Sequence, residues 1–405
     1  MSRTLPAVLL IALLCGCVGT SSTTHAPGGG TLDYTRPLSD GQPALRKVGS
    51  GDPAPDLAAA WQGRDLFLRD AVDHSLRWFE APSSRQWFPI EGVSHERARA
   101  SVRTFRTLLE KSRSEAEFVA AVQEQFDIYM SVGCDDAGTV LFTGYFAPDF
   151  RASSFPTLIY DTPLYSRPAD LATDPTDGRP LGQRMADGSV ASYPTRREIE
   201  DTGMLAGDEL VYVRDSLDAY TVHVNGSARL RMDDGTIRYI GYAGKTDQPY
   251  TGLGQSVLDE GLIPPNRLSL RRIRRLYDQD PEVINDLIAR NDCYVFFREY
   301  DGGSWPSGSL GVPVTTRRSV ATDKKIFPRG GVVLADTTVR SLTGDETSFT
   351  QFMIDQDTGG AIRAPGRADL FMGVGPTAGI KAGGQYAEGR LYYLFLKPDQ
   401  VAGVN

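Results

Sequence analysis

The chain has 405 residues, a formal net charge of −8 and 40% hydrophobic residues. This acidic balance argues against a nucleic-acid-binding protein, because such proteins usually present a basic face. The four histidines are widely scattered, which argues against a zinc site, and we expect neither a metal nor a cofactor. The length is sufficient for two domains, each with its own core, and the 42 glycines and 25 prolines favour a mainly β protein.

The N-terminus has the features of a bacterial lipoprotein signal. Arg3 precedes an apolar run from Leu5 to Leu14, which is too short to span a membrane, and Leu14-Cys-Gly-Cys17 follows. We expect residues 1–17 to be the signal segment, with cleavage before a lipidated Cys17; a plain secretory signal is the alternative. Val18 after the cysteine favours an outer-membrane lipoprotein that faces the periplasm. Residues 18–53, which are rich in Gly, Ser, Thr and Pro, read as a flexible tether.

The next part of the chain, residues 54–149, is predicted to contain helices and then the first strands of a barrel. Apolar spacing predicts helices over 56–79 and 94–109, and Ser114 begins another that continues through Tyr129. A β-branched and aromatic strand covers 139–148.

The buried-thiol and disulfide interpretations of Cys134 and Cys293 both remain open, since nothing local shows that they meet.

Residues 150–285 are predicted to form an inserted β domain. Short strand-like runs separated by turns suggest a small barrel, with Asp234-Gly235 as a hairpin turn. The predicted strands are 209–213, 220–224, 228–232 and 237–241. Two helices follow, over 269–277 and from Asp280. Strands resume at 294–297 and run to 390–396, and we assign 286–405 to the second part of the main barrel.

Two aspartates between glycine-rich turns are the candidate chemical groups of the sequence. Asp357 ends a strand before Gly359-Gly360, and Asp369 precedes Leu370-Phe371 and a second glycine-rich turn. Glycine permits close approach of the backbone to a ligand, and a partly dry carboxyl group can act as a general acid. The alternative is that both are surface acids that cap turns.

This stretch resembles the 3D region of the membrane-bound lytic murein transglycosylase A family, which is named for three aspartates. Here these would be Asp355 or Asp357, Asp369 and Asp336. Further motifs of the same pattern occur in family order across residues 140–397, and include Thr143-Gly-Tyr-Phe-Ala-Pro148, Tyr193-Pro-Thr-Arg196, Gly241-Tyr-Ala-Gly-Lys245 and Gly311-Val-Pro-Val-Thr315.

The resemblance implies a double-psi β-barrel domain with N-terminal helices, a smaller inserted β-barrel domain, and a groove between the two. It implies a peptidoglycan lytic exotransglycosylase, a lyase that cleaves the β-1,4 bond between N-acetylmuramic acid and N-acetylglucosamine and leaves 1,6-anhydromuramyl ends. Asp369 would be the single acid and base, with Asp357 as its neighbour. The expected partners are glycan strands, the membrane through the lipid anchor, and complexes with other cell-wall enzymes.

The resemblance also implies residues that bind the glycan. Thr143, Gly144 and Tyr145 would line the groove, although Tyr145 reads equally well as a core residue. The loop Asn225-Gly226-Ser227 would touch sugar, but it departs from the family's usual Gln-Gly-Ser-Gly-Arg, since Asn225 is shorter and Ala228 replaces a glycine. A non-catalytic glycan-binding lipoprotein and a hydrolysing muramidase remain the rival functions; the muramidase would need a second carboxylate to position water.

Overall fold

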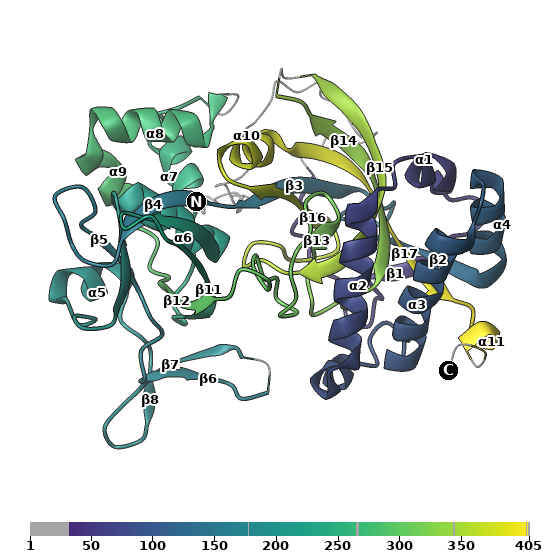
Figure 1. Cartoon of the computed structure of the whole chain (residues 1–405), viewed down its shortest axis with the longest axis horizontal. Helices are drawn as coiled ribbons and strands as arrows, with labels where there is room; N and C mark the ends of the chain where they lie inside the picture. The colour runs from purple at the N-terminus through teal and green to yellow at the C-terminus, as the bar shows by residue number, and fades with distance from the viewer. Residues whose placement is uncertain (1–31, 177, 265–266, 343–344, 402, 404–405) are drawn as a thin grey trace, which may run out of the picture.

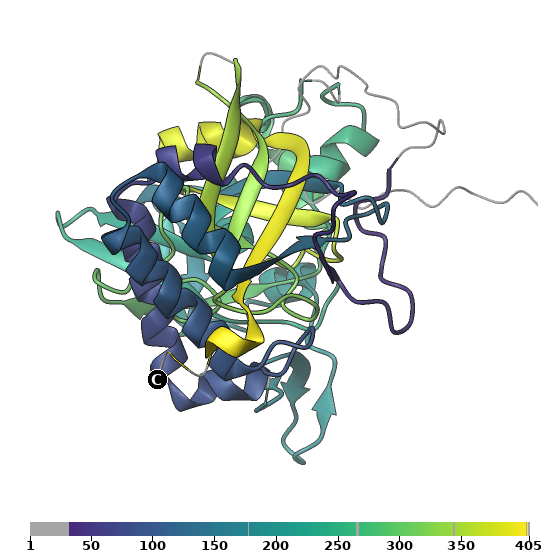
Figure 2. The same cartoon turned by 90° about the vertical axis from the view of Figure 1, so that its right-hand side faces the viewer.

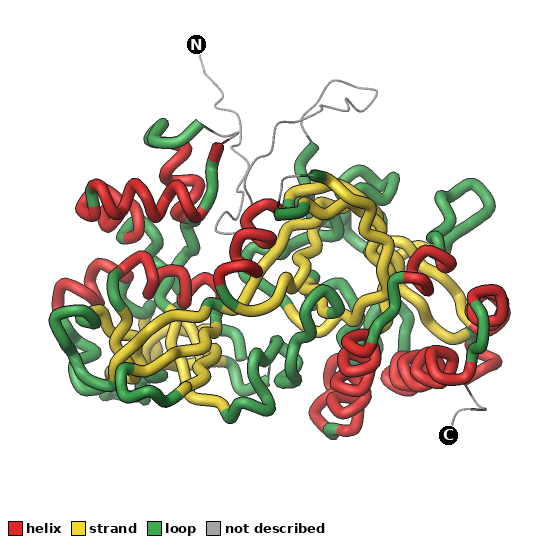
Figure 3. The backbone as a smooth tube through the Cα atoms, turned by 45° about the horizontal axis from the view of Figure 1, so that its top comes forward, coloured by secondary structure: helices red, strands yellow, loops and turns green. Residues whose placement is uncertain are grey.

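The strands of the protein form two large sheets, and most helices lie outside them (Figures 1 and 3). The computed structural model describes residues 32–176, 178–264, 267–342, 345–401 and 403. The predicted lipidation site, Cys17, lies outside the described residues. A mainly β fold with N-terminal helices confirms the predicted fold class.

The larger sheet is a closed structure. Its strand order is β1-β2-β17-β14-β15-β13-β16-β3, and β17 also pairs with β3, so the strands from β17 to β3 close into a barrel. Closure leaves the strands from β17 to β3 without a free edge, while β2 and β1 extend the sheet outside the ring. The strands are β1 (Leu45–Lys47), β2 (Phe126–Ser131), β3 (Val140–Ala147), β13 (Ser319–Ala321), β14 (Val332–Arg340), β15 (Glu346–Asp357), β16 (Arg367–Val374) and β17 (Tyr386–Leu396).

N-terminal helices cover one side of this barrel (Figure 2). Their aromatic residues pack between the helices and the barrel, where Trp61 stacks on Phe118 at 4.4 Å and Phe105 meets Phe352 of β15 at 5.0 Å. The helices on this side are α1 (Leu57–Gln62), α2 (Leu66–Glu80), η1 (Pro82–Trp87), α3 (His95–Lys111), α4 (Glu115–Gln125) and the short α11 (Pro398–Val401).

Two boundaries in this region differ from the prediction. The helix predicted over 56–79 is divided at Gly63, which ends α1, and Asp65 caps the start of α2 through its bond to the Leu68 N–H at 3.0 Å. The helix predicted to continue through Tyr129 ends at Gln125, because Phe126 begins β2 and pairs with Leu396. Sheet pairing with distant β17 overrides the local helical spacing there.

The smaller sheet has the strand order β12-β11-β10-β4-β9-β5, and a single bridge between Ser166 and Phe297 links its two ends. Gly235, at φ +86°, makes the predicted hairpin turn between β10 and β11. A separate small sheet of β6, β7 and β8 projects from this part (Figure 1). The strands are β4 (Asp149–Ser153), β5 (Thr162–Tyr165), β6 (Leu171–Thr173), β7 (Pro180–Arg184), β8 (Val190–Ala191), β9 (Glu209–Val213), β10 (Ser227–Met232), β11 (Ile237–Lys245) and β12 (Val295–Tyr300).

The predicted strand 220–224 is wrong, because this segment lies in helix α6. Its β-branched residues favour a strand, but Asp215 caps the N-terminus and Gly226, at φ +68°, ends the helix. These two caps and the burial of the helix on all sides, from Leu217 to His223, outweigh the weak local preference. The helices of this part are α5 (Arg196–Thr202), α6 (Ser216–Asn225), α7 (Leu253–Asp259), α8 (Leu270–Gln279) and α9 (Pro281–Ile288).

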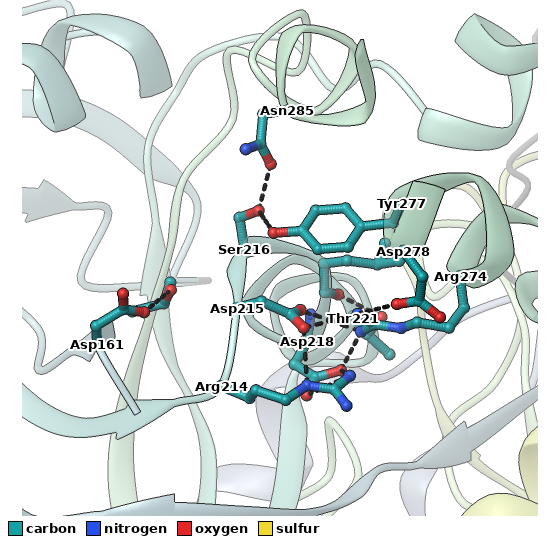
Figure 4. A network of polar contacts seen from close by, with 12 residues as sticks. Asp161, Arg214, Asp215, Ser216, Asp218, Thr221, Arg274, Tyr277, Asp278 and Asn285 are labelled. Carbon is teal, nitrogen blue, oxygen red and sulfur yellow. Dashed lines mark hydrogen bonds and ion pairs between the residues drawn. The ribbon is translucent and has the colours of Figure 1, made fainter. Parts of the chain in front are cut away.

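A polar network joins the start of α6 to α8 and α9 (Figure 4). Arg274 of α8 pairs with both Asp215 and Asp218, and the Ser216 hydroxyl lies 3.0 Å from the Tyr277 hydroxyl. Burial, and then the charge of Asp215, raise the pKa of Asp218 to about 6. The network therefore fixes α8 to α6 through Arg274, Asp215 and Asp218, which are mostly shielded from water.

The predicted domain boundaries stay predictions, although the smaller sheet includes β12, which lies after residue 285. Cys134 and Cys293 are both buried free thiols, so the structure shows the free-thiol alternative. Burial raises the pKa of the Cys134 thiol to about 11 and that of Cys293 above its usual value, which keeps both in the unreactive protonated form.

Candidate active site

The two candidate acids lie in one row across the barrel wall. Asp357 at the end of β15 is opposite Ala321 of β13, and Ala321 is opposite Asp369 of β16. On its other side Asp369 is opposite Thr143 of β3, which in turn faces Tyr386 of β17. Side chains in one row of a sheet share a face, so the fold brings together groups that are far apart in sequence. Between the two acids the row has only the methyl side chain of Ala321.

Asp369 is partly exposed, but its Oδ1 atom is shielded from water and has no hydrogen-bond partner among the described residues. The poorly hydrated surroundings raise the pKa of Asp369 to about 7. The guanidinium of Arg367 and a hydrogen bond from Thr143 oppose this shift, and the charge of Asp357 adds to it. A carboxyl group with this pKa can give up a proton and take it back near neutral pH.

Asp357 is held far more firmly than Asp369. Its Oδ1 accepts hydrogen bonds from the backbone N–H groups of Ser309 and Thr358, and its Oδ2 accepts one from the Tyr145 hydroxyl, all at 2.8 Å. Burial raises the pKa of Asp357, while these three hydrogen bonds lower it. The loop approaches this closely because position 308 is glycine: a Cβ there would lie 2.7 Å from the Gln356 carbonyl oxygen.

The structure brings the predicted segment Thr143-Gly144-Tyr145 to both acids. Thr143 lies beside Asp369, and Tyr145 bonds to Asp357 while its ring contacts Phe371 at 5.1 Å. Gly144 instead allows helix α10 (Pro376–Gly384) to pack on β3, since a Cβ would lie 3.0 Å from the Cα of Ala382. Tyr145 thus makes the core contact that was one of its two predicted roles, and its hydroxyl also bonds to an acid, while groove lining stays a prediction.

The predicted sugar-binding loop lies in the other sheet. Asn225 ends α6 and its side-chain amide donates to the Thr221 carbonyl at 2.8 Å, Gly226 is the helix cap, and Ser227 begins β10. Within the described ranges, no hydrogen bond or ion pair joins these three residues to Asp357 or Asp369. Their role in binding glycan stays a prediction.

The other aspartates of the C-terminal stretch have separate environments. Asp336 on β14 accepts from the Thr350 hydroxyl at 2.8 Å. Asp355 is fully buried, where it pairs with Lys324 and accepts from Thr322 at 2.8 Å and Tyr393 at 2.7 Å. Because every oxygen of Asp355 is engaged in this cluster, its role is to join β15 to the segment after β13.

Sequence reasoning missed two cations near the acids. Arg367 precedes Asp369 by two residues on β16, and the charge of Lys324 lowers the pKa of Asp357. The period of two along a strand would have placed Arg367 on the same face as Asp369. No sequence pattern could have placed Lys324, because it meets β15 only through the tertiary fold.

Two family models match this chain: the MltA specific insert domain over residues 141–298, and the 3D domain over residues 318–395. The chain is 31% identical over 271 residues to membrane-bound lytic murein transglycosylase A of Vibrio cholerae, a match that covers 65% of this chain and 68% of that protein. The chain belongs to the membrane-bound lytic murein transglycosylase A family. The Escherichia coli K12 member is 28% identical, over 67% of this chain and 70% of its own length.

Solved structures of the family share the fold. The membrane-bound lytic murein transglycosylase from Agrobacterium tumefaciens has a TM-score of 0.71 at 25% identity and covers 89% of this chain and 100% of its own. E. coli MltA with bound chitohexaose has a TM-score of 0.66 at 22% identity, over 91% of this chain and 98% of that one. Family membership confirms the resemblance that the motifs indicated.

No group of three or more His, Cys, Asp or Glu side chains among the described residues is arranged to hold a metal ion. Among the helices of the same residues, none is both long and apolar enough to cross a membrane.

Proposed function

We propose that this protein is a peptidoglycan lytic transglycosylase that cleaves the β-1,4 bond between N-acetylmuramic acid and N-acetylglucosamine and forms 1,6-anhydromuramyl ends. Asp369 is the single acid and base. The observation that carries the proposal is the state of this carboxyl group: it is partly exposed, has an unpartnered Oδ1, and has a pKa raised to about 7. The names of the family's relatives agree with this substrate class.

The reaction needs one proton to move twice. Protonated Asp369 gives its proton to the glycosidic oxygen as the bond from that oxygen to the muramyl C1 breaks. The resulting carboxylate then takes the proton of the muramyl 6-hydroxyl while that oxygen forms the new bond to C1. Asp369 ends protonated again, so no water and no second acid are consumed. A pKa near neutrality suits a group that must act first as acid and then as base.

The rival functions are less well supported. A hydrolysing muramidase needs a second carboxylate that can take a proton from water. Three hydrogen bonds occupy Asp357, the neighbouring acid, which makes it a poor acceptor for that proton. A protein that only binds glycan has no use for a poorly hydrated carboxyl group, whose burial opposes folding once it ionises.

The product of digestion tests this proposal. Purified protein incubated with isolated peptidoglycan should release fragments whose muramyl residues end in the 1,6-anhydro form, as measured by mass spectrometry. These fragments are lighter by one water than the products of hydrolysis. Reducing muramyl ends would instead establish the muramidase, and binding without any release would establish the non-catalytic protein.

We propose further that Cys17 carries the lipid anchor, on the evidence of the apolar run and cysteine that precede the tether. The relatives are named membrane-bound, which agrees with membrane association. Cys17→Ala should move the protein from the membrane fraction to the soluble fraction, because stable anchoring needs several acyl chains and the variant lacks the cysteine that would carry them. Cys15→Ala is the matched control and should stay membrane-bound. A Cys17→Ala protein that remains with the membrane would disprove the anchor.

Outer-membrane location, exo-cleavage and complexes with other cell-wall enzymes remain predictions.

A further inference from the structure

Arg367 is a buried cation with no carboxylate partner and few hydrogen bonds to stabilise its charge. Its side chain is 2% exposed, and no carboxylate of the described residues lies within ion-pair distance. Its Nη2 donates a hydrogen bond to the Thr143 hydroxyl at 3.3 Å, and its Nε has no partner among the described residues. Removing a guanidinium from water without a paired anion is costly, so this arrangement opposes folding.

The hydroxyl of Thr143 connects this cation to the acid. Thr143 is opposite Asp369 in the paired strands and its hydroxyl accepts the hydrogen bond from Arg367. The same hydroxyl lowers the pKa of the Asp369 carboxyl group, which places it beside that group. Arg367 and Asp369 are two residues apart on β16 and so share a face. The unpartnered Oδ1 of Asp369 and the unpartnered Nε of Arg367 therefore lie on one side of the barrel wall.

We propose that Arg367 and Thr143 are positioning residues that stabilise the carboxylate form of Asp369 after it has given its proton to the leaving oxygen. This inference rests on the proposed function of Asp369. Arg367 supplies the positive charge, and the Thr143 hydroxyl, which accepts from Arg367 and lies opposite Asp369, supplies a donor for the carboxylate once it forms. The cost of burying the cation is offset when the anion forms beside it, in the intermediate stage of the reaction.

The other groups around this pair do not replace the cation. Asp357 faces Asp369 from β15 with a charge of the same sign, and Tyr145 of β3 has a pKa far above neutral, so it is uncharged. Tyr386 of β17 and Tyr34, which binds Glu388, lie near Arg367 and also have raised pKa values. Among the described groups whose charge shifts the pKa of Asp369, Arg367 is therefore the one that is positively charged.

The test compares pH–rate profiles for release of anhydro fragments. Activity needs protonated Asp369, so it falls as pH rises through the pKa of that group. Removing the cation in Arg367→Met should raise this pKa, and the basic limb should move to higher pH by about one unit, with a rate at the optimum about 10- to 100-fold lower. Arg390→Met, a change on the exposed part of β17, is the matched control and should leave the profile unchanged.

Thr143 variants separate positioning from packing. Thr143→Val keeps the shape but removes the hydroxyl, and we expect a rate about tenfold lower. Thr143→Ser restores the hydroxyl and should recover most of that loss, which a purely structural role of the methyl group would not allow. A basic limb that does not move in Arg367→Met, or a Thr143→Ser protein as impaired as Thr143→Val, would overturn the inference. If Arg367→Met does not fold, the comparison of Thr143→Val with Thr143→Ser tests the inference by itself.

A direct titration keeps this inference separate from the proposed function. Carbon-13 NMR of labelled aspartate, with the Asp369→Asn spectrum used to assign the signal, measures the pKa of Asp369 without substrate. The pKa should be higher in Thr143→Val, and in Arg367→Met if it folds, than in the unchanged protein. If the pKa rises in the variants but the unchanged protein releases no anhydro fragments, the proposed function is refuted and the effect of Arg367 and Thr143 on Asp369 stands. If the pKa is the same in the variants and the unchanged protein is active, the proposed function stands and the effect of Arg367 and Thr143 is refuted.

Discussion

Asp369→Asn should reduce the release of anhydro fragments about 100- to 10,000-fold, the range that general acid catalysis contributes. The asparagine keeps the size of the side chain and its neighbour Thr143, but it has no proton to give to the leaving oxygen. No other described acid is placed to substitute, since Asp357 is engaged by three hydrogen bonds. The measurement is the initial rate of fragment release from isolated peptidoglycan.

Two controls accompany this variant. Asp336→Asn removes a carboxylate from β14 of the same barrel, whose contact is with Thr350, and should retain near-normal activity. Asp369→Asn itself should remain folded and bind glycan. Near-normal release by Asp369→Asn, or an equal loss in Asp336→Asn, would remove Asp369 from its role as the acid.

The stability of Asp369→Asn should depend on pH in a defined direction. The pKa of Asp369 in the folded protein, about 7, is above its usual value of 3.8. The folded state therefore binds the proton more tightly than the unfolded state, and stability falls as pH rises from the lower value to the higher one. Asparagine lacks this penalty, so its melting temperature should exceed that of the unchanged protein at pH 8 and approach it below pH 4. A variant that is less stable at pH 8 would argue against the raised pKa.

Asp357→Asn should have a smaller effect, with a rate about tenfold lower at neutral pH. Asparagine can still accept the two backbone N–H bonds from Ser309 and Thr358, and the Tyr145 hydroxyl can turn to accept from the new amide. The lost charge is the larger change. Because the Asp357 carboxylate raises the pKa of Asp369, its removal should lower that pKa, and the basic limb of the pH–rate profile should move to lower pH.

The direction of this shift is the useful measurement. Asp357→Asn and Arg367→Met remove opposite charges beside one carboxyl group, so their basic limbs should move in opposite directions. Movement in the same direction would mean that the two changes disturb packing rather than charge. An Asp357→Asn protein that loses all activity while Asp369→Asn stays active would show that the roles of the two acids are reversed.

The sequence alone determined much about this protein. Caps, turns and period-two strands predicted α3, the β10–β11 hairpin and the strand that ends at Asp357, because these features depend on residues near one another in the chain. The spaced motifs identified the family, and with it the pair Asp357 and Asp369. Thr143 and Tyr145 were also named, although only as residues that would line a groove.

Only the tertiary structure decided what these residues do to one another. The row that contains Asp357, Ala321, Asp369 and Thr143 comes from four strands whose order in the barrel no local pattern specifies. The raised pKa of Asp369 depends on how its neighbours exclude water, and the buried Arg367 depends on the closure of β16 against β3. Local propensity likewise could not foresee α6 at 220–224 or the strand at Phe126, because the partners that fix both segments lie far away in sequence.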